Sequence, residues 1–338
     1  MVLGGRVDDG VSTAAVFAMT VNADGICGEW TCLPPMPVSR QGGVAVALVP
    51  DLEKIVAEMR TVTSLTDFPP GLLPLMASYL GAERVFIAGG AYGDNLEDTI
   101  QRYSLDSGRW ETKMAGLPAM DTLFHGSLRG QAIGNRRLLI FGNGTSRPRF
   151  EGELIRFRVT SFDAHKERWA ALPSMIYARP GCCSAEWEGR VFVFGGFYDV
   201  PLFSCECYDT VTDRWSFIAS MKTPRYDAVA VSVPGLGILV MGGSFASHTS
   251  HVWPTWRTVD LYNPNTNCWT TMPWNLPTPL HNFVAHCIAG RIYLIGGVSD
   301  HICAECWSMD LTVDSPSWIP LPSLPIPTYQ MASVLLQP

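Results

Sequence analysis

The chain has 338 residues, of which 47% are hydrophobic, 11% aromatic and only 16% charged, with 31 glycines and 25 prolines. This balance excludes a disordered chain and suits many short strands joined by tight turns better than long solvated helices. The formal net charge of −7 argues against a general nucleic-acid binder, since such binding needs a surplus of lysine and arginine.

The ten cysteines lack the regular spacing of a disulfide scaffold and fall mostly inside apolar runs. We expect them to be reduced and mainly buried. The first residues have no basic segment followed by an apolar core, and no stretch approaches eighteen uninterrupted apolar residues. A cytoplasmic or nuclear protein, without contact to a membrane, is the resulting expectation.

Glycine pairs, or a degenerate version of one, punctuate the chain. Each complete pair from the second onward ends an alternating apolar run, as in Arg190 to Gly196, and such a run predicts a short buried strand. The pairs recur about every fifty residues, which is the signature of a repeat-built ring. Their positions are Gly4-Gly5, Gly89-Gly90, Gly142-Asn143, Gly195-Gly196, Gly242-Gly243 and Gly296-Gly297.

An aromatic residue followed seven positions later by a tryptophan comes after four of the glycine pairs. A proline-rich turn and a new apolar run then follow most of the tryptophans. The four aromatic pairs are Tyr103 and Trp110, Phe162 and Trp169, Tyr208 and Trp215, and Tyr262 and Trp269. The apolar strand, double glycine, tyrosine and tryptophan together resemble the kelch repeat.

The resemblance implies an all-β fold, a six-bladed kelch β-propeller with four antiparallel strands per blade. The aromatic hallmarks should pack between blades, with their polar atoms bonded to the neighbouring unit. Because the chain starts at a second strand, we expect Met331 to Leu336 to supply the missing inner strand beside Val2-Leu3 and close the ring.

We expect residues 1–338 to form a single propeller, with an insertion at about 50–74 between the first two blades. The insertion is either a loop packed on the propeller wall or a docking surface. Two segments compete to be the inner strand of the second blade, Gly43 to Val49 and Leu75 to Leu80, and the sequence does not choose between them.

Kelch propellers often bind a short acidic or polar peptide on the face that carries the entry turns and the loops after the glycines. Arginine offers a planar fork for carboxylates, and aromatic residues add contact area. The alternative for each entry-turn arginine is that it braces the blades. The resemblance places these candidates on that face: Arg6, Arg40, Tyr92, His125, Arg179, Phe197, Tyr198, Arg225, Tyr226, Phe245, His248, His281 and Tyr329.

Three other groups have structural interpretations. Cys205 to Cys207 and Cys303 to Cys306 are placed on third strands, where alternation separates the side chains, so neither group is expected to bind a metal. The arginine-rich stretch from Arg129 to Arg158 is interpreted as solvated strand edges rather than a site for an acidic partner or RNA.

The sequence contains no recognisable catalytic motif. The leading hypothesis is therefore a non-enzymatic, monomeric module without a cofactor that binds a protein or peptide. It would serve as a scaffold or as a substrate receptor of a ubiquitin ligase. The alternative is an enzyme that uses an acid/base pair in the channel on a small carbohydrate, similar to mutarotases or oxidases of this fold.

Overall fold

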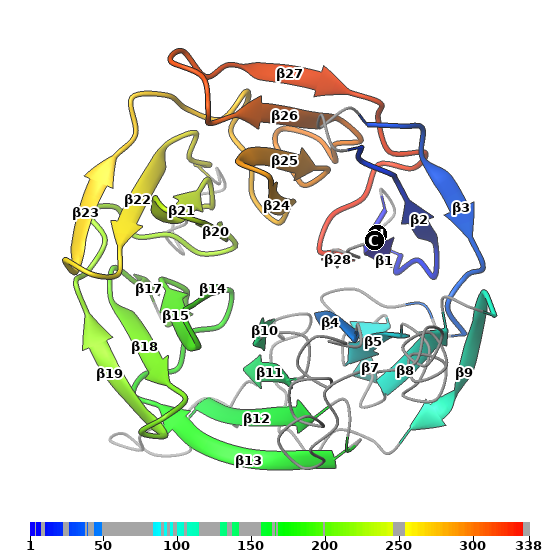
Figure 1. Cartoon of the computed structure of the whole chain (residues 1–338), viewed down its shortest axis with the longest axis horizontal. Coiled ribbons are helices and arrows are strands. Elements are labelled where there is room, and N and C mark those ends of the chain that lie inside the picture. The colour runs from blue at the N-terminus through cyan, green and yellow to red at the C-terminus, as the bar shows by residue number, and fades with distance from the viewer. Residues whose placement is uncertain are drawn as a thin grey trace, which may run out of the picture.

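The computed structural model describes residues 1–3, 5–7, 11–22, 27–37, 39, 44–48, 84–88, 91–92, 95–96, 100–104, 107–114, 129–133, 137–141, 157–163, 166, 168–198, 200–245 and 254–333. Every regular element in these ranges is a strand, and six four-stranded antiparallel sheets stand around a common axis (Figure 1). The all-β propeller predicted from the repeats is confirmed. No helix in the described ranges has the length and apolar character needed to cross a bilayer.

The strands of each sheet are ordered from the axis outward. The first three sheets consist of β28 (Ala332–Ser333), β1 (Val2–Leu3), β2 (Val16–Ala18) and β3 (Thr31–Leu33); β4 (Val44–Leu48), β5 (Arg84–Ala88), β8 (Ile100–Ser104) and β9 (Arg109–Met114); and β10 (Arg129–Ile133), β11 (Arg137–Phe141), β12 (Phe157–Asp163) and β13 (Arg168–Met175).

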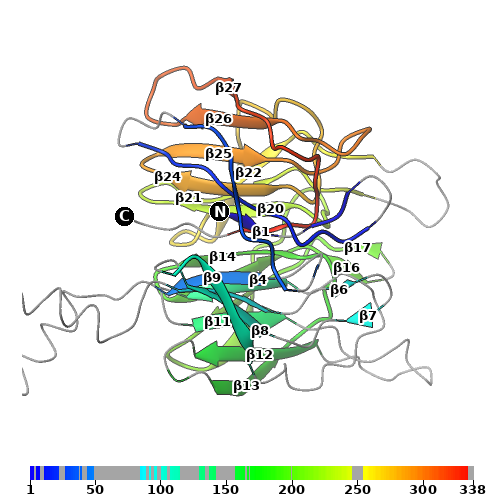
Figure 2. The ribbon, with the colours of Figure 1, turned by 90° about the vertical axis from the view of Figure 1, so that its right-hand side faces the viewer.

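The other three sheets consist of β14 (Cys183–Trp187), β15 (Arg190–Phe194), β18 (Cys205–Asp209) and β19 (Arg214–Ile218); β20 (Val229–Val233), β21 (Gly237–Met241), β22 (Val259–Asn263) and β23 (Cys268–Thr271); and β24 (Val284–Ile288), β25 (Arg291–Ile295), β26 (Cys306–Asp310) and β27 (Trp318–Leu321). Two small hairpins are added, β6 (Ala91–Tyr92) with β7 (Asn95–Leu96), and β16 (Phe197–Tyr198) with β17 (Val200–Pro201). Figure 2 shows the ring from its side, with the strands stacked in layers.

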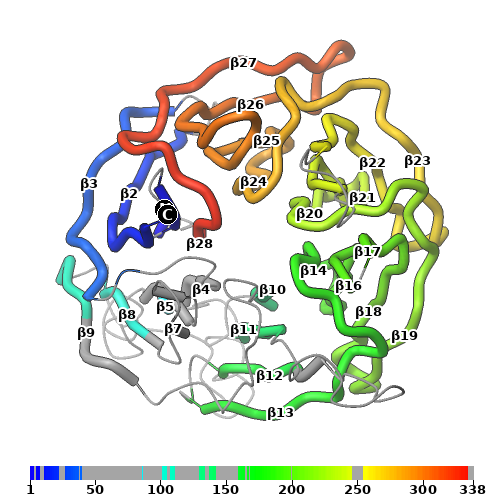
Figure 3. Tube along the Cα trace, turned by 180° about the vertical axis from the view of Figure 1, so that it is seen from behind, coloured from blue at the N-terminus to red at the C-terminus, as the bar shows by residue number. Residues whose placement is uncertain are grey.

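The first sheet joins distant parts of the chain. β28 pairs antiparallel with β1, with Val2 opposite Ser333 and Leu3 opposite Ala332. Seen from behind, the red C-terminal strand lies against the blue first sheet (Figure 3). Strands from both ends of the sequence therefore share one sheet.

The second sheet decides between the two candidate inner strands. β4 pairs with β5, with Val44 opposite Ala88 and Leu48 opposite Arg84, so the segment from Gly43 to Val49 supplies the inner strand. In sequence, residues 50–74 fall between β4 and β5, that is, within the second sheet. The sequence analysis had placed this insertion between the first two blades. The insertion itself and the segment from Leu75 to Leu80 lie outside the described residues.

The hydrophobic core lies between neighbouring sheets and not within any one of them. The fourth and fifth sheets, for example, share a cluster in which Phe192 and Phe194 pack against Ile238, Val240 and Tyr262. The Phe194 ring lies 5.7 Å from that of Tyr262 and 5.4 Å from that of Trp269. A single sheet could not bury both of its faces, so this packing requires the ring.

The tryptophans link consecutive sheets through hydrogen bonds. The indole nitrogen of Trp215 donates to the carbonyl oxygen of Pro173 at 2.8 Å, and that of Trp269 donates to Ala219 at 2.8 Å. Trp30, Trp110 and Trp318 donate in the same way to Pro322, Pro34 and Asn275. The predicted bonding to the neighbouring unit is confirmed for these tryptophans.

The tyrosine hydroxyls behave differently from the prediction. Tyr208 donates to Asp213 and Tyr262 to Asn267, so both bond to the last turn of their own sheet. The reason is local geometry, because each tyrosine lies only five residues before its acceptor, across the turn to the outer strand.

The glycine pairs allow a close approach between sheets. Gly195 has φ of 61°, and a Cβ atom there would lie 2.2 Å from the carbonyl oxygen of Arg225. The next glycine, Gly196, donates its N–H to that same oxygen at 2.8 Å. Only glycine fits a left-handed conformation this close to another backbone.

Candidate binding site at the ring entry face

The turns into the inner strands and the loops after the glycine pairs meet on one face, which we call the entry face. Backbone hydrogen bonds join the two kinds of loop: Tyr226 pairs with Ser244, and His281 with Val298, each through two N–H···O bonds. Tyr329 pairs likewise with Arg6, whose guanidinium lies 6.0 Å from the tyrosine ring centre. Three predicted site residues, Tyr226, His281 and Tyr329, therefore occupy equivalent positions.

A chain of backbone hydrogen bonds runs around this face next to the axis. Asp227 N donates to Gly181 O at 2.7 Å, Asn282 N to Asp227 O at 2.9 Å and Gln330 N to Asn282 O at 3.2 Å. All four residues have positive φ and stand two positions before an inner strand. Asp and Asn tolerate this conformation better than most side chains, which accounts for their presence here.

A polar cluster spans the axis at this level. The guanidinium of Arg129, at the start of β10, donates to Oδ1 of Asp227 and, at 3.3 Å, to Oδ1 of Asn282. Asn282 Nδ2 lies 3.1 Å from both Asp227 Oδ2 and His281 Nδ1. The Arg129 and Asp227 side chains are 20% and 17% exposed, so the pair is accessible from the entry face. Burial lowers the pKa of His281, and Asp227 opposes this shift.

An aromatic rim lies outside the polar cluster. The Phe197 ring, at the start of the β16 hairpin, lies 5.6 Å from the Tyr226 ring. Tyr198 and Phe245 are each 37% exposed. Burial raises the pKa of Tyr226 to about 12, and its hydroxyl is hydrogen-bonded with the Ser244 side chain. The rim therefore offers both apolar area and polar atoms.

Arg179 does not face a ligand. Its side chain is fully buried; Nε and Nη2 donate to Glu206 Oε1 at 2.9 and 2.7 Å, and Nη1 donates to the carbonyls of Gly195 and Ser204. Glu206 also accepts the N–H groups of Ile176 and Tyr177. The prediction that this arginine binds a partner is corrected, because its donors are used inside the fourth sheet.

Arg225 repeats this arrangement in the fifth sheet. Its side chain is 1% exposed and pairs with Asp260 at 2.5 Å. Nη1 donates to the carbonyls of Gly242 and Thr258 at 2.7 and 3.0 Å. The prediction that Arg225 binds a partner is therefore also wrong. Both arginines stabilise the loops of their own sheets, which agrees with the alternative that entry-turn arginines brace the blades.

Three of the remaining candidates, Arg40, His125 and His248, lie outside the described residues. Tyr92 belongs to strand β6, although its side chain is not among those described. The interpretation of the arginine-rich stretch as solvated strand edges is wrong at Arg129, because this side chain bonds across the axis to Asp227.

The sequence analysis missed Asp227 and Asn282 as site residues. A signal existed, because each directly follows a candidate, Tyr226 or His281, at the same place in its repeat. Their meeting with Arg129 could not be foreseen, since the partners are 98 and 153 residues apart.

The comparison with known protein families agrees with this geometry. The Kelch motif model matches residues 178–222, which run from the entry turn of the fourth sheet to the turn beyond β19. Residues 178–222 therefore carry a kelch motif, within a chain that folds as an all-β propeller.

Kelch relatives and one solved structure extend the match. Human "Kelch-like protein 23" is 22% identical over 60% of this chain and 42% of its own length, and an Arabidopsis thaliana F-box/kelch-repeat protein is 26% identical over 66% and 61%. The mouse "Influenza virus NS1A-binding protein homolog" is 42% identical over 21% of this chain and 11% of its own length. The chain thus spans less than two thirds of these relatives. "Structure of YjhT" matches with a TM-score of 0.68 and 10% identity over 94% of this chain and 96% of that one, which shows the fold alone.

Proposed function

We propose that this kelch propeller binds a segment of a partner protein on its entry face. The observation that carries the proposal is the placement of exposed aromatic side chains, Tyr198 and Phe245, on loops around a half-buried polar cluster. Aromatic anchors beside a few fixed hydrogen-bonding groups are typical of sites that dominate binding energy. The kelch relatives, one of them named for binding influenza virus NS1A, support a protein ligand.

The partner's chemistry follows from the polar groups of the entry face that are not fully buried. An acidic peptide was expected because of Arg40, Arg179 and Arg225, but the last two are buried and paired. The Arg129 and Asp227 pair instead offers a donor and an acceptor side by side. We therefore propose a peptide that brings a polar group to this pair and an apolar side chain to the aromatic rim. A role within a ubiquitin ligase, or as a scaffold, remains part of this proposal.

The test uses peptides selected from a random display library on the purified wild-type protein. Tyr198→Ala and Phe245→Ala should each weaken a selected peptide by at least about tenfold, as expected of anchor residues. The matched control is Phe217→Ala, since Phe217 is 51% exposed on the outer strand β19. The proposal fails if the selected peptides bind both rim variants as tightly as wild type.

One observation favours a second function. Asp227 and His281 approach the same Asn282 at the axis, and a carboxylate beside an uncharged imidazole can exchange protons with a small polar ligand. This arrangement supports the alternative of an enzyme that acts on a small carbohydrate in the channel. Ligand-observed NMR with a panel of monosaccharides should detect binding that Asp227→Asn abolishes, and absence of any binding to wild type would exclude it.

A further inference from the structure

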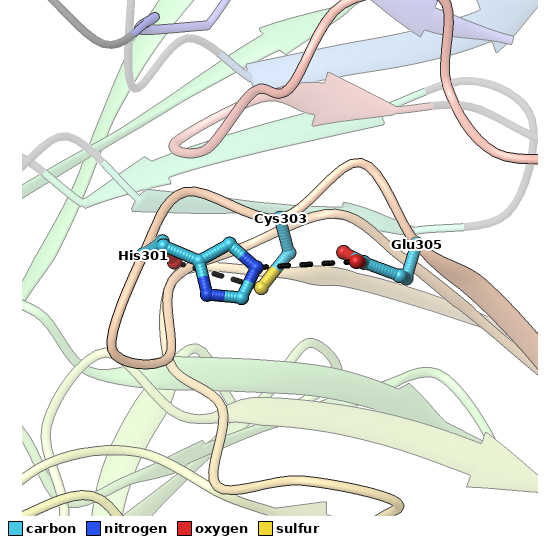
Figure 4. A group of neighbouring side chains, drawn as sticks. All are labelled: His301, Cys303 and Glu305. Atoms are coloured by element: carbon cyan, nitrogen blue, oxygen red, sulfur yellow. Dashed lines mark hydrogen bonds and ion pairs between the residues drawn. The ribbon is translucent and has the colours of Figure 1, made fainter.

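A cluster of three metal-ligand side chains lies on the loop between β25 and β26. Figure 4 shows His301, Cys303 and Glu305 pointing toward one another, and their nitrogen, sulfur and oxygen atoms all lie within 4.8 Å of each other. His301 Nε2 is 3.9 Å from Glu305 Oε1. Cys303 is 3% exposed, whereas the other two side chains reach solvent. The cluster therefore has a buried thiol at its base and an open side.

The strand boundary explains why the sequence did not predict this cluster. Cys303 to Cys306 was assigned to a third strand, where alternation would separate the side chains. β26 begins only at Cys306, so Cys303 and Glu305 belong to the bent loop before it. Cys306 packs in another core cluster than Cys303, which removes it as a ligand.

A pocket of about 190 Å³ adjoins the cluster and is lined by all three residues. In the fourth sheet the corresponding space holds the guanidinium of Arg179, which donates to the carbonyl oxygens of Gly195 and Ser204. In the fifth sheet it holds that of Arg225, which donates to the carbonyl oxygens of Gly242 and Thr258. The equivalent residues of the sixth sheet are Gly296 and Glu305, joined by the same backbone bond. Leu280 and Trp307 replace the arginine and its carboxylate, and both line the pocket.

A neighbouring carboxylate orients the histidine. Asp300 Oδ1 lies 2.6 Å from His301 Nδ1, so the other ring nitrogen, Nε2, faces Cys303 and Glu305. Histidines that bind metals almost always donate their second ring N–H to such an acceptor, which fixes the tautomer.

We propose that His301, Cys303 and Glu305 form a Zn²⁺ site with Asp300 as the positioning residue. Mixed nitrogen, thiolate and carboxylate ligands suit zinc, whereas Mg²⁺ and Ca²⁺ require oxygen ligands. Three protein ligands leave one tetrahedral position for water or for an atom of an incoming ligand, and this position opens toward the pocket. Thr278 Oγ1 and Ser299 Oγ, 3.2 Å apart, lie in the pocket wall and can hydrogen-bond a molecule there.

Metal binding here requires the Cys303 thiol to lose its proton to solvent as the zinc–sulfur bond forms. No oxidation is involved. The site is independent of the proposed peptide binding, because no rim or axis residue is a ligand.

The test is titration of the reduced, metal-free protein with Co²⁺, then displacement by Zn²⁺. Wild type should bind one Co²⁺ with the visible absorption of a tetrahedral ion and a thiolate charge-transfer band in the near ultraviolet. His301→Ala and Glu305→Gln, both at exposed side chains, should weaken binding by well over tenfold. Asp300→Asn should weaken it by about 10- to 100-fold, as is usual for outer-shell partners.

Two thiol variants complete the design. Cys303→Ser should remove the charge-transfer band, and Cys268→Ser is the matched control because Cys268 is an exposed free thiol on β23. Near-ultraviolet circular dichroism checks that each variant is folded. The proposal is overturned if wild type binds no Co²⁺ at a one-to-one ratio, or if the folded His301→Ala variant binds it as tightly as wild type.

Discussion

The fourth and fifth sheets fill the space behind their entry turns with an arginine–carboxylate pair, whereas the sixth sheet has a pocket there. Arg179 with Glu206 and Arg225 with Asp260 are buried and bonded to loop carbonyls. Leu280 and Trp307 stand at the same positions of the sixth sheet. One repeat position is therefore filled by a buried ion pair in two sheets and borders a pocket in a third.

The first sheet extends the comparison. Thr328 stands where the arginine would be, and Phe17, opposite Val2, stands where the carboxylate would be. In both cases the cation and the anion are replaced together. Since a buried charge without its partner is costly, the two positions must change as a pair.

The largest expected effect follows from breaking one pair. Arg179→Ala leaves Glu206 buried and uncompensated, so the free energy of unfolding should fall by about 3–5 kcal/mol, measured by urea denaturation. Arg179→Met combined with Glu206→Gln should recover part of the loss, because no unpaired charge then stays buried, while one amide oxygen remains as an acceptor for the N–H groups of Ile176 and Tyr177. An equal loss in the single and double variants would show that the charges are not coupled.

The sequence predicted the ring because the ring depends on features that recur. Glycine pairs, tryptophans and proline turns report local geometry, and their period places each strand within a few residues. The boundary of β26 shows the limit of this precision. The strand was predicted to begin at Cys303 but begins at Cys306, so Cys303 was assigned to a strand although it lies in a loop. The second sheet shows another, because the sequence left two segments, Gly43 to Val49 and Leu75 to Leu80, as candidates for its inner strand.

The candidate site was harder to predict because it depends on pairing across sheets. An arginine in an entry turn has the same local sequence whether it faces solvent or a buried carboxylate. Glu206 was the available signal, since an acidic residue inside a strand with otherwise apolar and aromatic packing needs a partner. The contact of Arg129 with Asp227 has no local signal at all.

Introducing an arginine–carboxylate pair into the sixth sheet tests the same comparison through the affinity for Co²⁺. Leu280→Arg with Trp307→Asp should fill the sixth-sheet pocket with a guanidinium. Its N–H groups should donate to the backbone carbonyl oxygens of Gly296 and Glu305. A fixed cation beside the cluster should then weaken Co²⁺ binding by more than tenfold while the protein remains folded. Leu280→Met, which adds no charge, should leave the affinity near that of wild type. Undiminished binding in the folded double variant would contradict the equivalence of the two positions.

A more gradual effect is an acid sensitivity that distinguishes two histidines of the sixth sheet. His286 on β24 lies 2.9 Å from Ser333 Oγ on β28, and burial lowers its pKa from 6.5. His301 is exposed, and the bond to Asp300 raises its pKa. The two should therefore titrate on opposite sides of the ordinary histidine value.

The sign of the stability change follows from His286. Below pH 6.5 the unfolded chain takes up a proton that the folded protein excludes, so the free energy of unfolding should fall by at most about 1.4 kcal/mol per pH unit as the pH decreases. His301 acts in the opposite direction, because its charged form is favoured in the folded protein and its contribution is lost as the pH rises through its raised pKa. Urea unfolding between pH 7 and 4 measures the slope, and His286→Gln should reduce it whereas His301→Gln should not. A slope unchanged by His286→Gln would mean that the contact between the last inner strands does not control the acid stability of the ring.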